Sequence, residues 1–371
     1  MGQIICNPRL IMIAAGTTHS LFVDEHGNVW GCGNNSQGQL GPLPKGNSPP
    51  TLIPEIVNVA YVAARNHSLF VDHDGDLWGC GINDQFNLGL PTNHSYNTIT
   101  KIAGLPAIKS VAVTHNYSLA LAEDGEVYAT GVNPNGQLGL LEKKPIQGWT
   151  RLQNIPKIES LTAGFSHSLF VDGNGNVWSC GSNGGSRLGR SGNTDVPRMI
   201  PGLPPIKTVA AGWTHSLFLD NDKNVWAVGS NENYQLGIKA PSQSTPVRVE
   251  PNVGEVMLIS AGHYHSIIQG IEGVFSCGKN MEGAMAVGVG SKIISKSSTL
   301  ENIAIVQIST HYHSLFLDRE GVVWSCGKNT DGQLGLGEHE PKVIIPETVN
   351  GLPAIGRFAR CSAKSARKVD N

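Results

Sequence analysis

Residues 15–41 read AGTTHSLFVDEHGNVWGCGNNSQGQLG, and this stretch decides the fold. The apolar run HSLFVD is followed by a turn containing Gly and Asn and then by a second apolar run, VWGCG. A further apolar run, LIMIAAG at 10–16, comes just before them. Short runs rich in Val, Leu, Phe and Trp that alternate with such turns are typical of consecutive hairpin strands.

The same pattern recurs along the whole chain. A His-Ser pair followed by an apolar run occurs six times, and Tyr117-Ser118 fills the one missing place; the six histidines are His19, His67, His167, His215, His265 and His313. Successive copies are 48 to 50 residues apart, so seven copies account for nearly all of the 371 residues. We therefore expect residues 1–371 to form a single domain of seven repeats.

A fourth short segment closes most repeats, as in TLIPEIV at 51–57 and VPRMIPG at 196–202. Its prolines suit an edge strand, where a missing N–H does no harm. Four antiparallel strands in each of seven repeats, with almost no helical signal, predict an all-β, seven-bladed β-propeller. Residues 353–365 align with 106–118 and with 8–20, which predicts a ring closed by the chain ends and a loose tail over 366–371.

The repeat itself resembles a known one. The motif A-G-x-x-H-S-L-F-V-D-x-x-G-x-V-W-x-C-G-x-N-x-x-G-Q-L-G stands most completely at 15–41, 163–189 and 211–237, and it resembles the repeat of the regulator of chromosome condensation (RCC1) family. The third repeat departs from it at Tyr117 and Thr130, and the sixth loses the final GQLG. The resemblance implies a propeller that binds proteins. Likeness to the founding member of that family would further imply nucleotide exchange on a Ran-like small GTPase and binding to chromatin.

Composition narrows the class of partner. The chain has 45 glycines, 15% charged residues and a formal net charge of −2, so it has no bulk attraction for nucleic acid or anionic membranes. It has no apolar run of about 18 residues, and its first residues do not look like a signal peptide. We expect a monomeric intracellular protein, cytoplasmic or nuclear, that binds a protein partner and no specific nucleic acid sequence.

Residue types that could carry chemistry recur at fixed blade positions, which favours structural roles. Cys32, Cys80, Cys180, Cys277 and Cys326 share a position that Val228 also occupies, so we expect packing and no disulfides. The repeated histidine is expected to hydrogen-bond nearby backbone and fix its turn. Two His-x-His pairs, at 263–265 and 311–313, have a spacing that zinc sites use, but spacing alone does not specify a metal. We predict no catalytic residues, no metal and no cofactor.

One turn position does vary between blades. The residue two before each repeated His or Tyr is, in order, Thr17, Arg65, His115, Phe165, Trp213, His263 and His311. Large aromatic residues beside a channel are what interfaces use as anchors, although they can also fill space between blades. We predict that the partner-binding residues are Arg65, His115, Phe165, Trp213, His263, Tyr264, His311 and Tyr312. Because three of them are histidines, binding is expected to change between pH 7 and pH 5.5.

The turns between the second and third strands carry many acids and lie on the opposite face. The predicted acidic face comprises Asp24, Asp72, Asp74, Asp76, Glu123, Asp124, Asp220, Asp222 and Asp318. Turn chemistry alone also favours Asp here, so this acidity has a second explanation.

Two functions remain open at this point. The first is a non-enzymatic scaffold that binds a protein partner through one propeller face. The alternative is a guanine-nucleotide exchange factor for a Ran-like GTPase or a chromatin-binding regulator, with a small GTPase or a histone as partner. The repeats vary by only two residues in length and leave no room for the wedge-shaped insertion of that family's founding member. This observation favours the scaffold.

Overall fold

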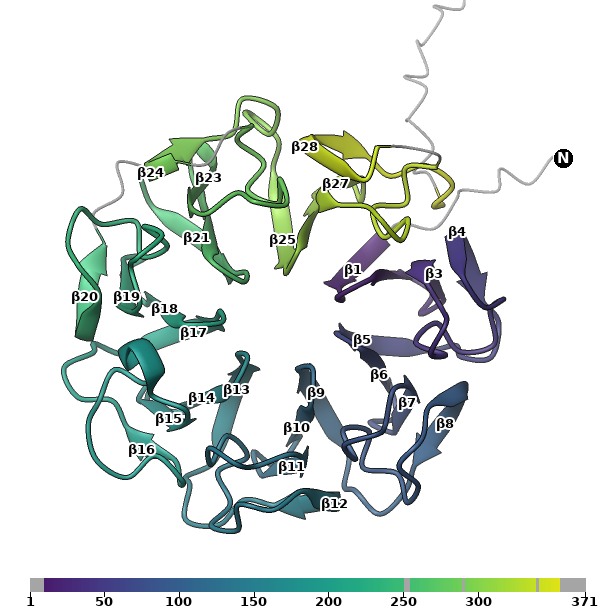
Figure 1. The fold of residues 1–371 in the computed structure, drawn as a ribbon, viewed down its shortest axis with the longest axis horizontal. Coiled ribbons are helices and arrows are strands. Elements are labelled where there is room, and N and C mark those ends of the chain that lie inside the picture. Colours follow the sequence, from purple (N-terminus) through teal and green to yellow (C-terminus); the bar gives the residue numbers. More distant parts are fainter. Residues whose placement is uncertain (1–9, 250–253, 289–290, 338–339, 354–371) are drawn as a thin grey trace, which may run out of the picture.

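The computed structural model describes residues 10–249, 254–288, 291–337 and 340–353, and these residues form a ring of seven four-stranded antiparallel sheets (Figure 1). Each blade uses four consecutive strands, from the innermost to the outermost. The first three blades contain β1 (Leu10–Ala15), β2 (His19–Asp24), β3 (Val29–Asn34) and β4 (Asn47–Ile53); β5 (Val59–Ala64), β6 (His67–Asp72), β7 (Leu77–Gly81) and β8 (Tyr96–Ile102); and β9 (Ile108–Val113), β10 (Tyr117–Ala122), β11 (Val127–Gly131) and β12 (Ile146–Arg151).

The other four blades repeat this order. They contain β13 (Ile158–Ala163), β14 (His167–Asp172), β15 (Val177–Gly181) and β16 (Arg198–Met199); β17 (Ile206–Ala211), β18 (His215–Asp220), β19 (Val225–Gly229) and β20 (Gln243–Val249); β21 (Val256–Ala261), β22 (His265–Gly270), β23 (Gly273–Gly278) and β24 (Ser291–Lys296); and β25 (Ile305–Thr310), β26 (His313–Asp318), β27 (Val323–Lys328) and β28 (Lys342–Thr348). A 3-10 turn, η1 (Gly184–Ser186), is the only helical element among the described residues. The predicted seven-bladed propeller is confirmed.

The hydrophobic core lies between neighbouring blades. Phe218 of β18 is fully buried and packs with Leu169 and Val171 of the preceding blade. The equivalent Phe22 of blade 1 packs with Leu315 of blade 7. Apolar burial is the main favourable term in folding, so each blade depends on both neighbours for its stability.

The first and last blades meet side by side. The backbone N–H of Ile13 donates to Gln307 Oε1 at 2.9 Å, and that of Ala15 donates to Ser309 Oγ at 2.9 Å. The ring of the described residues is therefore complete, with β1 as the inner strand of blade 1. Of the predicted closing segment 353–365, all but the first residue lies outside the described residues, as does the predicted tail 366–371.

The cysteine prediction is confirmed for the described residues. The five blade cysteines are buried and free. Their thiols lie near carbonyls of the preceding blade, as for Cys32 Sγ at 3.4 Å from the Gln333 oxygen. Burial raises the pKa of the Cys32 thiol to about 12, so this side chain is not a thiolate at neutral pH. No helix of the described residues is long and apolar enough to cross a membrane.

Candidate functional site

The repeated histidines form a belt that links the blades. Each ring Nε2 lies 2.7–3.0 Å from a hydroxyl of the next blade; the pairs are His19–Ser68, His67–Ser118, His167–Ser216, His215–Ser266, His265–Thr310 and His313–Ser20. The serine hydroxyl donates its own hydrogen to a loop carbonyl, as Ser68 does to Gln39 at 2.6 Å. In the His–Ser pairs Nε2–H is therefore the donor. Burial lowers the pKa of these rings, to about 3 for His19 and His67, so they are neutral at pH 7.

Blade 3 completes the belt with a different group. The Tyr117 hydroxyl lies 2.7 Å from the carbonyl of His167 and 3.1 Å from Ser168 Oγ. We expected each repeated histidine to bond nearby backbone through its ring. That expectation was wrong about the partner, because the ring reaches across the blade boundary to a side-chain hydroxyl. The position is structural, and the blade that lacks the histidine keeps the interblade link.

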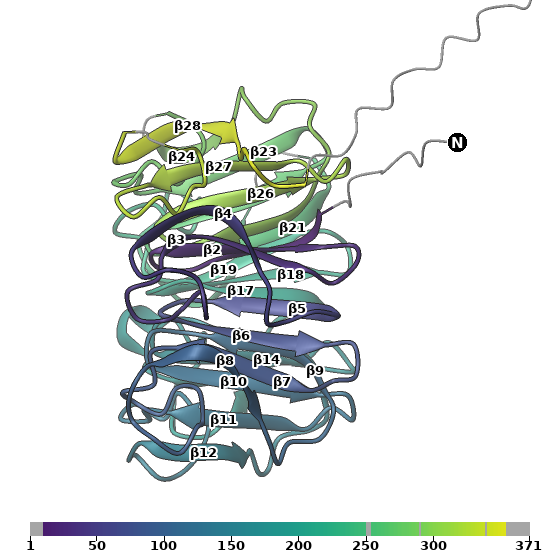
Figure 2. The ribbon, with the colours of Figure 1, turned by 90° about the vertical axis from the view of Figure 1, so that its right-hand side faces the viewer.

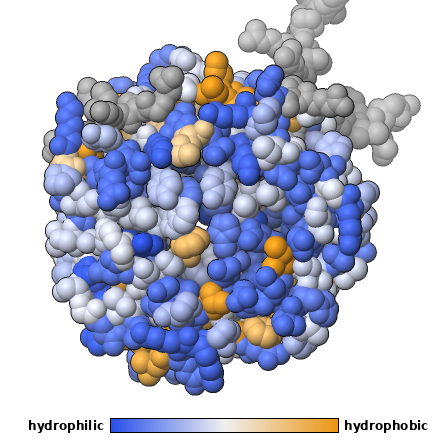
Figure 3. All heavy atoms as spheres, in the orientation of Figure 1, coloured by the Kyte–Doolittle hydropathy of each residue, from blue (hydrophilic) through white to orange (hydrophobic). Residues whose placement is uncertain are grey.

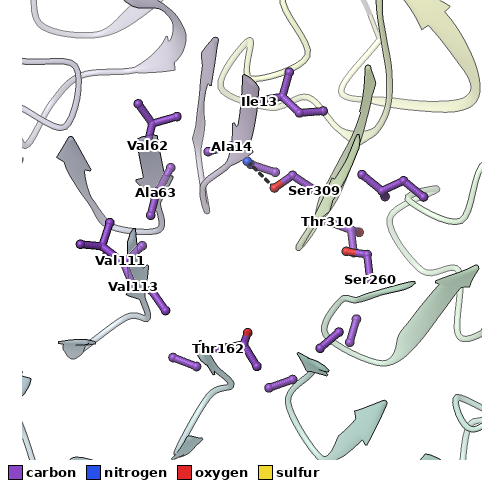
Figure 4. Close-up of a pocket in the computed structure, with 18 of the residues that line it drawn as sticks. Ile13, Ala14, Val62, Ala63, Val111, Val113, Thr162, Ser260, Ser309 and Thr310 are labelled. Carbon is purple, nitrogen blue, oxygen red and sulfur yellow. Dashed lines mark hydrogen bonds between the residues drawn. The ribbon is translucent and has the colours of Figure 1, made fainter. Parts of the chain in front are cut away.

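The central channel runs along the ring axis inside this belt. Its walls are the inner strands of all seven blades, and Ala14, Val113 and Ser260 are among the residues that line it (Figure 4). The open space has a volume of about 240 Å³. Seen from the side, strands run between the two faces of the disc, so one end of each inner strand lies at each face (Figure 2).

Aromatic rings gather at the mouth where the inner strands end. Trp213 stacks on His263 with ring centroids 3.4 Å apart and planes at 16°, and the Phe165 ring centroid lies 4.6 Å from that of Trp213. Tyr264 and Tyr312 contact His263 at 4.4 and 4.9 Å. We call this group the aromatic cap; its members are His115, Phe165, Trp213, His263, Tyr264, His311 and Tyr312.

The cap crosses the channel instead of following its rim. His115 of blade 3 and His311 of blade 7 have ring centroids 5.4 Å apart. These blades are not neighbours, since β9 and β25 lie on opposite sides of the channel (Figure 1). Rotational repetition of the turn position predicts that these residues follow one another in an arc around the channel. The structure corrects this arrangement to one cluster that covers part of the mouth.

Exposure differs within the cap. Phe165 is 42% exposed, whereas His311 is only 6% exposed, and the other members are half-buried. The rings of the cap therefore pack against one another and also leave part of their surface exposed to solvent. Seen along the ring axis, one face of the molecule is mostly hydrophilic with scattered apolar side chains, and no broad apolar patch covers it (Figure 3).

Arg187 supports the cap, and the sequence analysis did not single it out. Its Nη1 donates to the carbonyl oxygen of Trp213 at 2.7 Å and to Ser166 Oγ at 3.1 Å, and its Nε donates to the Gly184 carbonyl at 2.7 Å. It thus ties the turns that carry Phe165 and Trp213. The available signal was the change from GQLG to SRLG at 186–189, where other blades have Gln39, Gln137, Gln235 or Gln333.

The cap histidines do not titrate near neutral pH. Burial lowers the pKa of His115 to about 4 and that of His263 to about 3, and the positive charge of Arg65 adds to both shifts. His311 has its pKa lowered well below 6.5 for the same reasons. The predicted change of binding between pH 7 and pH 5.5 through these side chains is therefore corrected, because they stay neutral over that range.

The His-x-His pairs do not converge on a metal site. His265 and His313 are used by the belt, as described above. Among the described residues no group of three or more His, Cys, Asp or Glu side chains is placed to hold a metal ion.

The opposite face owes most of its acids to turn construction. Asp172 accepts the backbone N–H groups of Asn174 and Asn176 through Oδ1 and the indole N–H of Trp178 through Oδ2, all at 3.0 Å. The equivalent Asp72, Asp220 and Asp318 also accept an indole N–H. The turn explanation therefore holds for these aspartates.

Bases also neutralise part of this face. Lys157 lies 3.5 Å from Asp124 and 2.6 Å from Glu126, and Lys101 pairs with Asp76. The exposed acids left on this face include Asp74, Glu123 and Asp222. Net acidity is lower than the sequence predicted.

Matches to models of known protein families identify the family of this chain. Models described as regulator of chromosome condensation (RCC1) repeats match residues 13–39, 108–137, 158–185, 174–219, 206–235, 222–269 and 320–363, which together are more than half of the chain. The chain belongs to the RCC1 repeat family. The matches fall in six of the seven blades, so the family assignment does not rest on one repeat.

The chain is also similar to solved structures and to a further relative. This RCC1-repeat chain is similar to Prp20p from Saccharomyces cerevisiae, described with its binding to Gsp1p and histones, at a TM-score of 0.76 and 25% identity over 92% of this chain and 87% of that one. It shares its fold with human WBSCR16, at a TM-score of 0.74 and 22% identity over 87% and 93%. It is 35% identical over 105 residues to the human probable E3 ubiquitin-protein ligase HERC6, a match that spans 27% of this chain and about a tenth of that protein.

Proposed function

We propose that this RCC1-repeat propeller is a non-enzymatic scaffold that binds a protein partner through the aromatic cap and Arg65. The observation that carries the proposal is the cap itself, in which partly exposed aromatic rings from five blades meet at one channel mouth. Interfaces are enriched in Trp, Tyr, Phe and Arg, the residue types that gather here together with histidine. Similarity to Prp20p, described with protein partners, supports the same class of function and an intracellular, nuclear or cytoplasmic site of action.

Capture experiments test the proposal. Immobilised protein is compared with Phe165→Ala on the cap and with the double variant Asp74→Lys, Asp222→Lys on the opposite face. We expect Phe165→Ala to reduce capture of a specific partner several-fold, because its exposed ring is lost at an anchor position. The double variant should capture as wild type. If the charge reversals abolish capture and Phe165→Ala does not, the binding face has been misassigned.

A second function is nucleotide exchange on a small GTPase, and the likeness to Prp20p favours testing it, since that structure is described with binding to Gsp1p. All strands of the described residues belong to the seven blades, so none of these residues forms an inserted β-wedge. We therefore expect no more than a slight acceleration when release of labelled GDP from a Gsp1p-like GTPase is measured. Acceleration by orders of magnitude would replace the scaffold with an exchange factor.

A further inference from the structure

Arg65 is a cation with no acid beside it in the described part of the chain. Its Nη1 donates to the carbonyl of Ala15 at 3.1 Å, and no other hydrogen bond or ion pair joins its guanidinium to the described residues. Burial lowers its pKa to about 10, so the group remains charged at neutral pH. A desolvated charge is costly unless it is paired, and here the pairing is incomplete.

The neighbours of Arg65 cannot supply the missing charge. Arg65 lines the channel and also the small space beneath the cap, together with His115, His263 and His311. These histidines are neutral at pH 7. Its side chain is partly exposed, so an incoming group can reach it.

An apolar pocket adjoins this cation. It lies between blades 6 and 7, has a volume of about 160 Å³, and is lined by Tyr264, Tyr312, Met281 and Ala284, with Lys279 and Glu282 also contributing. His263 and His311 form its wall toward Arg65, because both also line the space in which Arg65 lies. A pocket of this size accommodates one side chain and is smaller than typical ligand pockets of 300 Å³ or more.

We propose that the cap recognises an acidic peptide segment of its partner, in which a carboxylate pairs with Arg65 and a nearby apolar side chain fills the pocket between blades 6 and 7. This inference rests on the proposed function, since it requires the cap to be the docking face. A guanidinium presents a planar pair of donors that matches a carboxylate. Arg65 lies among neutral rings, and the adjoining pocket adds one base, Lys279, and one acid, Glu282. So small a positive charge, in a chain of net charge −2, fits one carboxylate better than a polyanion such as nucleic acid.

A displayed library of random peptides is the probe. It is selected on the wild-type chain, and enriched peptides are then measured by fluorescence anisotropy. We expect enrichment of Asp or Glu within a few residues of an apolar side chain. Arg65→Gln should weaken binding about tenfold or more, as loss of a charge-assisted pair does. Arg65→Lys should weaken it less, because the charge is kept.

A double-mutant cycle shows whether the two groups meet. Replacing the peptide acid by its amide should weaken binding to wild type and change little with Arg65→Gln. Equal losses with both proteins, no acidic enrichment, or no enriched peptide that depends on Arg65 would each overturn the inference. Thermal unfolding checks the variants, and Thr17 at the equivalent place in blade 1 indicates that the turn tolerates a neutral residue.

The same experiment separates this inference from the proposed function. If Trp213→Ala abolishes peptide binding and Arg65→Gln does not, the cap remains the docking face and carboxylate recognition is wrong. If neither variant matters, both proposals fail.

Discussion

Lowering the pH from 7.5 to 5.5 is expected to cut the free energy of unfolding by several kcal/mol. Burial lowers the pKa of His19, His67, His215 and His313 to about 3, that of His265 to about 4, and that of His167 well below 6.5. Protons therefore bind the unfolded chain first as the pH falls. The stabilisation is fully present above pH 6.5 and is lost between about 6.5 and 3, at about 1 kcal/mol per histidine by pH 5.5.

Chemical denaturation at a series of pH values measures this effect. Hydrogen bonds to their carboxylates lower the pKa values of Asp172 and Asp220, so these two groups do not titrate between pH 7.5 and 5.5. The variant His19→Gln is the matched control. It should be less stable at pH 7.5, and its loss of stability per pH unit between 6 and 5 should be smaller by about 1 kcal/mol. A stability that stays flat from pH 7.5 to 5.5 would contradict the neutral, buried belt.

Trp213→Ala is expected to weaken partner binding by about 2 kcal/mol or more, which is roughly thirtyfold in Kd. Trp213 contacts both Phe165 and His263, and its backbone carbonyl accepts a hydrogen bond from Arg187, so its ring is held in place at the centre of these contacts. Truncation to alanine removes the area with which the Trp213 ring would contact the partner, and it also removes the ring against which Phe165 and His263 pack.

Trp213→His is the matched control for this change. Histidine occupies the equivalent place at 115, 263 and 311, where its ring contacts other rings of the cap. We expect a smaller loss of affinity with histidine than with alanine, measured by titration calorimetry with the captured partner. Both variants should keep a cooperative unfolding transition near that of wild type. Undiminished affinity with Trp213→Ala would exclude it as an anchor.

Sequence periodicity predicted the blades because each repeat carries its own strand and turn signals. The histidine equivalent to His67 recurs in six repeats and the cysteine equivalent to Cys80 in five, each at a fixed place. This recurrence identified structural positions without any coordinates. The residues of the cap were also predicted, because rotational repetition puts equivalent turns on one face.

The sequence could not predict which side chains of different blades contact one another, either between neighbouring blades or across the ring axis. Contact between His115 and His311 depends on the diameter of the channel, which no repeat encodes by itself. The hydrogen bond of Arg187 to Trp213, and the lowered pKa values of the cap histidines, likewise depend on packing between blades. Asp72 and Asp220 misled the charge analysis, because their carboxylates accept hydrogen bonds from turn backbone and indole N–H groups.

Hydroxyl-radical footprinting of the chain, free and bound to its captured partner, tests the central claim most directly. The cap is rich in reactive aromatic side chains, and Met257, which is 49% exposed at the other end of inner strand β21, reports on the opposite face. The account predicts that binding protects Phe165, Trp213, Tyr264 and Tyr312 from oxidation and leaves Met257 unchanged. Protection of Met257 with no change at the four cap residues would contradict it.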